Sequence, residues 1–166
     1  MNALPPRPLT ARQHDYRAIF ISDLHLGTRG CRSDFLADFL RRTTCENLFL
    51  VGDVIDGWRL RKSWYWDPIC DEVLRLILWH ARNGANVTYI PGNHDEMFRA
   101  WLPMGLEIAG IRLRAEASHV TADGKRLLVI HGDEFDSVVR YARIRKIASM
   151  RSPRACLIAS AASSRS

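Results

Sequence analysis

Four short apolar segments constrain the fold of this chain more than any other feature of its sequence. They are Ala18–Ile21, Leu48–Val51, Val87–Ile90 and Leu127–Ile130, and each is continuous rather than alternating with polar residues. Such runs are typical of strands that are buried on both faces in layered α/β folds. The segments therefore predict a mainly parallel sheet that is covered on both sides.

Helical patterns separate the first three segments. The pair Asp67-Pro68 predicts the start of a helix that ends near Asn83-Gly84. Ser33 is a candidate N-cap of an earlier helix. The apolar face of that earlier helix consists of Phe35, Leu36, Phe39 and Leu40. The order strand, helix, strand, helix, strand predicts parallel strands joined by right-handed crossovers.

The fourth segment belongs to a predicted β-hairpin. Asp123-Gly124 stands between Ala117–Ala122 and Lys125–Ile130, and this dipeptide favours a tight turn between two strands. With 166 residues the chain has about the length of one domain. We expect residues 1–15 to be an N-terminal extension and residues 16–143 to form an α/β domain. Residues 144–166 are predicted to be a disordered basic tail rich in Ala, Ser and Arg.

The positive charge of the chain is concentrated at one end. Six of the 24 Lys and Arg residues lie in Ala142–Ser166, which has no acidic residue, and the other 18 balance the 18 Asp and Glu residues elsewhere. The net charge of +6 therefore comes from one segment rather than from a basic surface. For this reason we do not expect nucleic acid to be the partner of the chain.

The sequence also favours a cytoplasmic location. Met1–Gln13 lacks an apolar run, and no apolar stretch reaches the roughly 18 residues that a membrane span needs. The four cysteines show no CxxC spacing, so reduced thiols are the preferred interpretation.

Candidate metal ligands follow each of the four apolar segments. In chain order they are Asp23 and His25, then Asp53 and Asp56, then Asn93, His94 and Asp95, and finally His131 and Asp133. Open α/β sheets bind ligands beyond the carboxyl ends of their strands, so we expect the four loops to meet at one edge of the sheet. An isolated Asp-x-His or a single histidine is weak evidence of a metal site. Four successive strand ends that supply such residues are much harder to obtain by chance.

The donor types indicate a particular chemistry. Imidazole, carboxylate and amide oxygen suit divalent ions such as Mn²⁺, Fe²⁺ or Zn²⁺, and the lack of cysteine argues against a closed structural zinc site. Two such ions held together by a shared carboxylate can polarise a phosphoryl group. Gly52, Gly92 and Gly132 stand next to candidate ligands, where tight loops favour a residue without a Cβ.

The motifs DLH, GDVID, GNHD and HGD, in this order, resemble the calcineurin-like metallophosphoesterase superfamily over about Tyr16–Arg143. The resemblance implies a layered α/β sandwich of mainly parallel sheets flanked by helices, and two divalent ions, with Mn²⁺ expected and Fe²⁺ or Zn²⁺ as alternatives. It assigns one ion to Asp23 and His25 and the other to Asn93 and His131. Asp53 is the bridge between them.

The resemblance also assigns catalytic roles in the GNHD motif. His94 protonates the leaving oxygen or stabilises charge on the phosphoryl group, and Asp95 orients His94 through a hydrogen bond. Asp56 has two interpretations, as a metal ligand or as an acceptor of local backbone hydrogen bonds. The local role is preferred.

Within the superfamily, the chain most resembles the UDP-2,3-diacylglucosamine pyrophosphatases and their paralogues. The resemblance is carried by Leu128–Asp136 and Asp56–Trp66. It implies a lipid-linked nucleotide, a precursor of lipid A, as substrate and contact with the cytoplasmic surface of the inner membrane. His94 stands where the best-established enzymes of this kind have arginine, which moves the chain towards the paralogues.

The aromatic and basic segment Trp58–Trp66 has three interpretations. Trp58, Trp64 and Trp66, interleaved with cations, can meet acyl chains and anionic headgroups at a membrane. The same aromatic residues can pack the loop onto the following helix, which is the more frequent role of such residues. Stacking on single-stranded nucleic acid is the third interpretation, and the neutral body of the chain disfavours it.

The superfamily pattern ends with Gly-His-x-His, and its two histidines complete the two metal shells. The six histidines of this chain end with His131, so this final pair is missing. We expect a family member that is truncated at its C-terminus, with one ligand fewer for each ion and an incomplete fold. A metal- or phosphate-binding fragment with impaired catalysis is therefore an alternative to an active enzyme. A phosphodiesterase or nuclease of the same superfamily is another.

Overall fold

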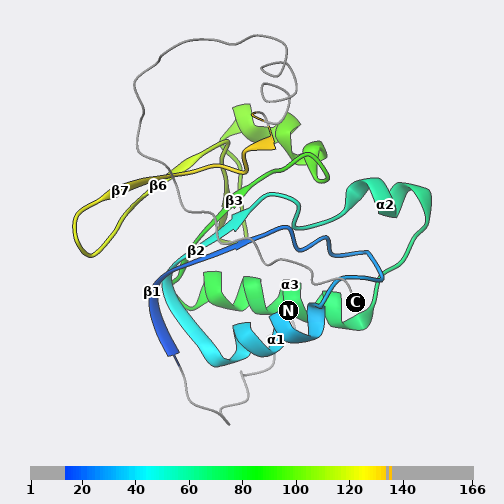
Figure 1. The fold of residues 1–166 in the computed structure, drawn as a ribbon, viewed down its shortest axis with the longest axis horizontal. Coiled ribbons are helices and arrows are strands. Elements are labelled where there is room, and N and C mark those ends of the chain that lie inside the picture. Colours follow the sequence, from blue (N-terminus) through cyan, green and yellow to red (C-terminus); the bar gives the residue numbers. More distant parts are fainter. Residues whose placement is uncertain (1–13, 134, 136–166) are drawn as a thin grey trace, which may run out of the picture.

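A five-stranded sheet is the centre of the computed structural model, which describes residues 14–133 and 135 (Figure 1). The order of its strands is β1-β2-β3-β5-β4. The predicted N-terminal extension, up to Gln13, and the predicted basic tail, residues 144–166, lie outside the described residues. Their predicted structure therefore stays a prediction.

The three strands that lead to the candidate ligands run parallel. They are β1 (His14–Ser22), β2 (Thr43–Val51) and β3 (Asn86–Ile90). Two short strands that were not predicted complete the sheet: β5 (Ile111–Leu113) is parallel to β3, and β4 (Glu107–Ile108) is antiparallel to β5. The mainly parallel α/β architecture expected from the apolar segments is confirmed.

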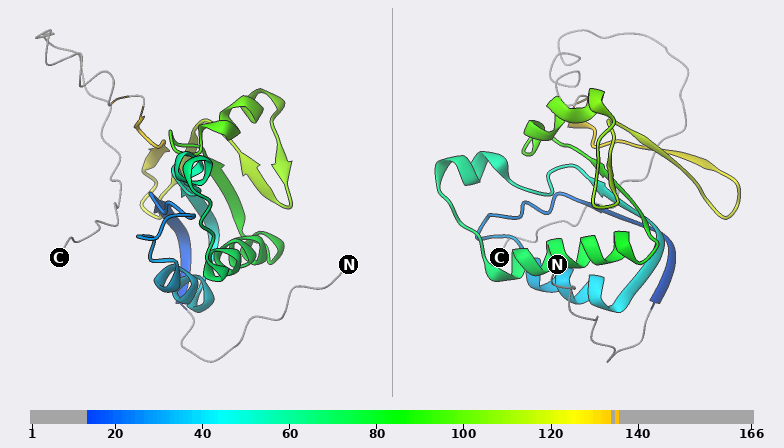
Figure 2. Two further views of the ribbon diagram at one scale, coloured as in Figure 1. Left: turned by 90° about the vertical axis from the view of Figure 1, so that its right-hand side faces the viewer. Right: turned by 180° about the vertical axis from the view of Figure 1, so that it is seen from behind.

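Two helices, α1 (Ser33–Arg42) and α3 (Pro68–Arg82), pack together on one face of this sheet (Figure 2). The strands point alternate side chains to this face, where Ile19, Leu48 and Val87 are in register and form one apolar cluster with both helices. The predicted limits of α3 are correct. The Asp67 carboxylate accepts a hydrogen bond from the Ile69 N–H (2.9 Å), and Asn83 ends the helix.

The predicted hairpin is present and covers part of the other face. Its strands β6 (Ala117–Val120) and β7 (Arg126–Val129) pair in antiparallel fashion. Val129 and Ala117 pack on side chains that β2 and β3 direct away from the helices. The hairpin forms a separate two-stranded sheet, so the fourth loop does not leave the main sheet. It nevertheless meets the other loops as expected, because His131 Nε2 lies 3.6 Å from Asp53 Oδ1. The hairpin strands stack against the main sheet by apolar contact instead of joining its backbone ladder.

The predicted apolar face of α1 is also wrong in part. Ser33 is the first helical residue rather than the cap, and its hydroxyl donates to Cys31 Sγ at 3.1 Å. Ser33, Ala37 and Leu40 are the buried residues of this helix, whereas Phe35 and Phe39 are 62% and 38% exposed. Spacings of three and four residues put the buried positions on one side of the helix, and the two phenylalanines lie on another.

Two short helical elements lie beside the candidate ligand loops. The helix α2 (Gly57–Lys62) is capped by the Asp56 carboxylate, which accepts a hydrogen bond from the Arg59 N–H at 2.8 Å. The 3-10 element η1 (Glu96–Met104) follows the GNHD motif. Neither these elements nor the longer helices of the described residues are long and apolar enough to cross a membrane. Cys31, Cys45 and Cys70 are free thiols, and Cys156 lies outside the described residues.

The cap of α3 yields a stability prediction. Asp67→Ala removes the acceptor for the Ile69 N–H, so we expect the free energy of unfolding to fall by about 1 kcal/mol. Asp67→Asn keeps an acceptor oxygen at the same position and is expected to retain most of that stability. Urea unfolding of the two variants and the parent chain tests this. Equal losses in both variants would show that the cap is not the source of the effect.

Candidate metal centre

The loops after β1, β2 and β3 are held side by side by backbone hydrogen bonds that continue beyond the strands. The Asp23 N–H donates to the Gly52 carbonyl (3.2 Å), and the His25 N–H donates to the Asp53 carbonyl (2.8 Å). The Gly52 N–H donates to the Ile90 carbonyl (2.7 Å). Since the strands are parallel and in register, candidate ligands far apart in the sequence meet beyond their carboxyl ends.

Three of the candidate ligands adopt the left-handed backbone conformation. The φ angles of Asp23, His25 and Asp53 are 54°, 50° and 54°. This region is uncommon for residues with a Cβ, although Asp, Asn and His enter it more readily than most. Strained conformations of this kind concentrate at functional sites. Here they occur at ligand positions in two adjacent loops.

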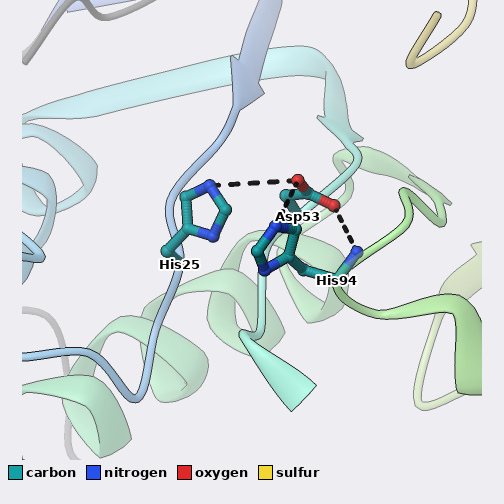
Figure 3. Close-up of side chains that lie close together, drawn as sticks. All are labelled: His25, Asp53 and His94. Carbon is teal, nitrogen blue, oxygen red and sulfur yellow. Dashed lines mark hydrogen bonds and ion pairs between the residues drawn. The ribbon is translucent and has the colours of Figure 1, made fainter. Parts of the chain in front are cut away.

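Asp53 lies at the centre of the cluster, with only 4% of its surface exposed. Its Oδ2 atom is 3.9 Å from His25 Nε2 and 4.0 Å from His94 Nε2, and its Oδ1 atom is 3.6 Å from His131 Nε2. The backbone N–H of His94 donates to Oδ1 at 2.9 Å. Figure 3 shows the rings of His25 and His94 next to this carboxylate.

The ligand atoms form two groups that share Asp53. One group is His25, Asp53 and His94, and the other is Asp23, Asp53 and His131, with all ligand atoms of a group within 4.8 Å of one another. The separations of 3.6–4.0 Å between imidazole nitrogen and carboxylate oxygen exceed hydrogen-bond length. Two ligands at about 2.0–2.2 Å from one ion lie roughly 3–4 Å apart, so these residues fit divalent ions.

The grouping differs from the one that the sequence resemblance implied. In the structure Asp23 lies with His131 rather than with His25, and His94, predicted to be catalytic, lies with His25. Asn93 is in the same loop as His94 and is partly buried. The assignment of individual residues to ions, including that of Asn93, stays a prediction.

Asp95 does not orient His94, which corrects the prediction for this pair. The buried Asp95 carboxylate accepts hydrogen bonds from the Gly92 N–H (2.6 Å), the Val54 N–H (2.9 Å) and the Tyr89 hydroxyl (2.5 Å). These bonds hold the loops after β2 and β3 together. The Asp95 carboxylate is therefore engaged by two backbone N–H groups and the Tyr89 hydroxyl, and its role is to hold these loops rather than to orient His94.

Asp56 takes the orienting position instead. One of its carboxylate oxygens lies 3.1 Å from His94 Nδ1 and the other lies 3.3 Å from His25 Nδ1. The His94 contact is close but lacks hydrogen-bond alignment. Both rings consequently direct Nε2 at Asp53. The preferred interpretation, a local backbone acceptor, is correct for the bond from Arg59 and incomplete because it omits the two histidines.

Two groups around the cluster have shifted pKa values, in opposite directions. Burial opposes the charge on Asp56, but the hydrogen bond from Arg59 and the neighbouring His94 and His25 outweigh it and hold the pKa of Asp56 below its usual value. Burial, and then the nearby Asp95 carboxylate, strongly raise the pKa of Tyr89. Tyr89 therefore remains a neutral donor to Asp95.

Residues 16–159 match the family model of the calcineurin-like phosphoesterases. The chain belongs to this family. Its members are hydrolases that typically bind divalent metal ions, which agrees with the shared position of Asp53 in two ligand groups.

Curated relatives of this phosphoesterase carry two different names. A UDP-2,3-diacylglucosamine hydrolase from Stutzerimonas stutzeri is 28% identical over 135 residues, which are 78% of this chain and 53% of the relative. One from Pseudomonas syringae pv. tomato is 31% identical over 123 residues, 69% of this chain and 46% of the relative. A DNA polymerase II small subunit from Methanothermobacter thermautotrophicus is 24% identical over 157 residues, 76% of this chain and 32% of the relative.

The chain thus spans between about a third and about half of the length of these relatives. The polymerase subunit is a relative that the charge distribution gave no reason to expect, and it is a minor conflict with the expectation that nucleic acid is not the partner.

Two glycines bring the phosphoesterase loops close together. A Cβ on Gly92 would lie 2.2 Å from Asp53 Oδ1 and 2.8 Å from His131 Nε2. A Cβ on Gly52 would lie 1.9 Å from His131 Nδ1. The His131 ring therefore rests on backbone that has no side chain, as expected from the position of these glycines next to the ligands. His131 Nδ1 also lies 3.3 Å from the Val51 carbonyl.

Trp58, at the start of α2, lies against the predicted catalytic histidine. Its ring centroid is 4.3 Å from that of His94, and its indole N–H donates to Glu96 Oε1 at 3.3 Å. The residue is nevertheless 42% exposed. Trp58 therefore packs against the residues after β3, and not onto the following helix as the packing interpretation expected. That interpretation is correct for Trp66, whose indole N–H donates to Asp71 Oδ1 in α3 at 2.7 Å. An open part of the Trp58 ring remains at the edge of the ligand cluster.

The contact distances at Gly92 predict the effect of one added methyl group. Gly92→Ala must displace Asp53 or His131, so we expect Mn²⁺ to bind at least about tenfold more weakly, as measured by isothermal titration calorimetry. Gly30→Ala is the matched control, because a Cβ at Gly30 would have no atom within 4 Å. Unchanged affinity in Gly92→Ala would contradict the proposed ligand arrangement.

Because His25 has a left-handed backbone, we expect glycine at this position to stabilise the fold at least as well as alanine, the reverse of the usual order. At this position Gly avoids a steric cost of about 1–2 kcal/mol that Ala incurs, which outweighs its greater freedom in the unfolded chain. We expect His25→Gly to be at least as stable as His25→Ala in urea unfolding without metal. At His119, which has no positive φ, the Gly variant should be the less stable one. Ala variants that are more stable at both positions would show that His25 is unstrained.

Proposed function

We propose that this chain carries the catalytic centre of a metal-dependent hydrolase that cleaves a phosphate ester or anhydride. The observation that supports it most strongly is the buried Asp53 carboxylate, which two groups of candidate ligands share. The left-handed ligand residues and the glycine contacts of His131 indicate that the loops are built around this arrangement.

The proposal gives each residue a role. Asp53 is common to both ions, His25 and Asp23 belong to one group each, and His131 completes the second group. When bound, such ions polarise the phosphoryl group and supply a nucleophile at neutral pH. The chain itself positions these ligands and keeps their carboxylates and imidazoles close to the Asp53 carboxylate.

His94 is proposed to act on the leaving group. Its side chain is about a quarter exposed (26%), and Asp56 at Nδ1 leaves Nε2 directed at the centre. From this position Nε2 can donate a proton to the leaving oxygen or a hydrogen bond to the phosphoryl group. The same atom cannot bind an ion at that moment. Loss of turnover with normal metal content in His94→Gln would support the catalytic role over the ligand role.

The proposed substrate is a UDP-2,3-diacylglucosamine-type lipid precursor, and the proposed metal is Mn²⁺. The names of the bacterial hydrolases favour this substrate over other phosphoesters. Exposed side chains on the elements that follow the ligand loops suit an amphipathic anion. Exposed apolar residues on α2, on η1 and in the segment after α2 are Trp58, Trp64, Met97, Trp101 and Met104. Exposed cations on α2 are Arg59, Arg61 and Lys62.

These exposed aromatic residues and cations support a proposed location. Aromatic residues and cations together favour contact with anionic membrane lipids. We therefore propose that the chain acts in the cytoplasm, at the surface of the inner membrane. Binding to vesicles that contain anionic lipid, weakened in Trp64→Ser, would support this location.

The proposed function predicts strict dependence on Asp53. In Mn²⁺, the parent chain should hydrolyse UDP-2,3-diacylglucosamine, and Asp53→Asn should lower kcat/KM by about a hundredfold or more, as should removal of metal with a chelator. Asp38→Asn is the matched control, because Asp38 is an exposed carboxylate paired with Arg42. Equal activity in Asp53→Asn and the parent chain would contradict the proposal.

The alternatives make different predictions in the same assay. Faster cleavage of single-stranded DNA than of the lipid would favour a nuclease, which the polymerase relative makes worth testing. Bound Mn²⁺ without turnover of any phosphoester would favour a metal-binding fragment.

A further inference from the structure

His131 reaches the centre from an element outside the main sheet. The other candidate ligands follow β1, β2 and β3, whose register fixes their loops relative to one another. Within the described residues, β7 pairs only with β6, in a separate two-stranded sheet. Backbone pairing therefore does not determine how far His131 lies from Asp53.

Apolar packing holds the hairpin against the main sheet. Val129 is buried against Phe49, Val51 and Ile90, whereas Leu128 on the next position of β7 is about half exposed. Apolar contact is non-directional, so it tolerates small shifts of one sheet over the other. His131 Nδ1 lies 3.3 Å from the Val51 carbonyl, and this contact restrains the ring itself. The backbone that carries His131 needs a directional restraint of its own.

Arg99 in η1 supplies a directional link between the two loops concerned. Its Nη2 atom donates to the Pro91 carbonyl at 3.2 Å and to Asp133 Oδ2 at 2.5 Å. Pro91 directly precedes Gly92 in the loop after β3, and Asp133 lies two residues after His131. The Asp133 side chain is only 14% exposed, so this ion pair is shielded from solvent more than a surface pair.

The contacts of Arg99 with Pro91 and Asp133 flank the place where His131 lies against Gly92. The His131 ring lies so near Gly92 that a Cβ there would be 2.8 Å from Nε2. Arg99 holds the backbone just before Gly92 and the carboxylate just after His131 with one nitrogen. The planar guanidinium has its donors in a fixed geometry, which suits it for this task better than a flexible ammonium group.

We propose that Arg99 is a positioning residue for His131. It keeps the imidazole against Gly92 and Asp53 and thereby completes the ligand group of Asp23, Asp53 and His131. The consequence for metal binding rests on the proposed function, whereas the placement of the ring does not. Arg99 needs no contact with substrate or metal for this role.

The first test uses metal-free protein and NMR. A nuclear Overhauser effect between the His131 ring protons and Gly92 Hα should be present in the parent chain and lost or strongly weakened in Arg99→Met. Arg42→Met, which removes an exposed ion pair with Asp38, should keep it. Asp133→Asn, which retains the size of the side chain, should weaken it as well. An undiminished effect in both Arg99→Met and Asp133→Asn overturns the proposal.

The second test measures Mn²⁺ binding. Arg99→Met should weaken the ion that depends on His131 by about 10–100-fold and leave the other ion unchanged. Combining Arg99→Met with His131→Ala should add no further loss, and Arg99→Asp with Asp133→Arg should recover part of the affinity. Lower thermal stability with both affinities intact would reduce Arg99 to a structural role and overturn the proposal.

The two tests separate this inference from the proposed function. If the parent chain binds no Mn²⁺, the proposed function fails, and the NMR test alone decides the role of Arg99.

Discussion

The buried Asp53 carboxylate is the group on which the rest of this structure depends. Burying a charge is unfavourable unless hydrogen bonds or opposite charges compensate it. The carboxylate accepts a hydrogen bond from one backbone N–H, and three imidazole nitrogens lie 3.6–4.0 Å from it. These distances leave room for cations between the ligands. We therefore expect metal ions to raise the free energy of unfolding, because ions that fill this space bind the folded state and not the unfolded state.

The geometry around Asp53 comes from two kinds of order. Parallel strands in register bring three loops to one edge of the sheet, and their backbone bonds continue into the loops. The fourth loop arrives from a hairpin that is stacked on the sheet and linked through Arg99 and Asp133. The positions of the first three loops follow from cooperative backbone pairing between strands. The position of the fourth loop depends on individual side chains, so the His131 side of the centre is the more sensitive to single substitutions.

Local strain is concentrated in the same loops. Asp23, His25 and Asp53 occupy the left-handed region, and the glycines beside them leave no space for a methyl group. The apolar clusters on both faces of the sheet must offset this cost. This separation between a stabilising core and strained loops is typical of a centre on a rigid α/β scaffold, in which the loops carry the chemistry.

The sequence by itself determined the three parallel strands that lead to the ligands, the helix after Asp67, the hairpin and the residues that gather around Asp53. These follow from apolar periodicity, turn chemistry and strand-end position. It misjudged whatever depends on contact between distant segments. Asp95 was expected to orient His94 because it is adjacent in sequence, yet it bonds to the backbone of two loops, and Asp56 takes that place. Phe35 and Phe39 matched a helical stripe, but the face that meets α3 contains Ala37 and Leu40. Nor did any local pattern connect Arg99 with Asp133. Only the tertiary structure decided these points, because side-chain partners are fixed by distances across the fold, whereas periodicity records only neighbours along the chain.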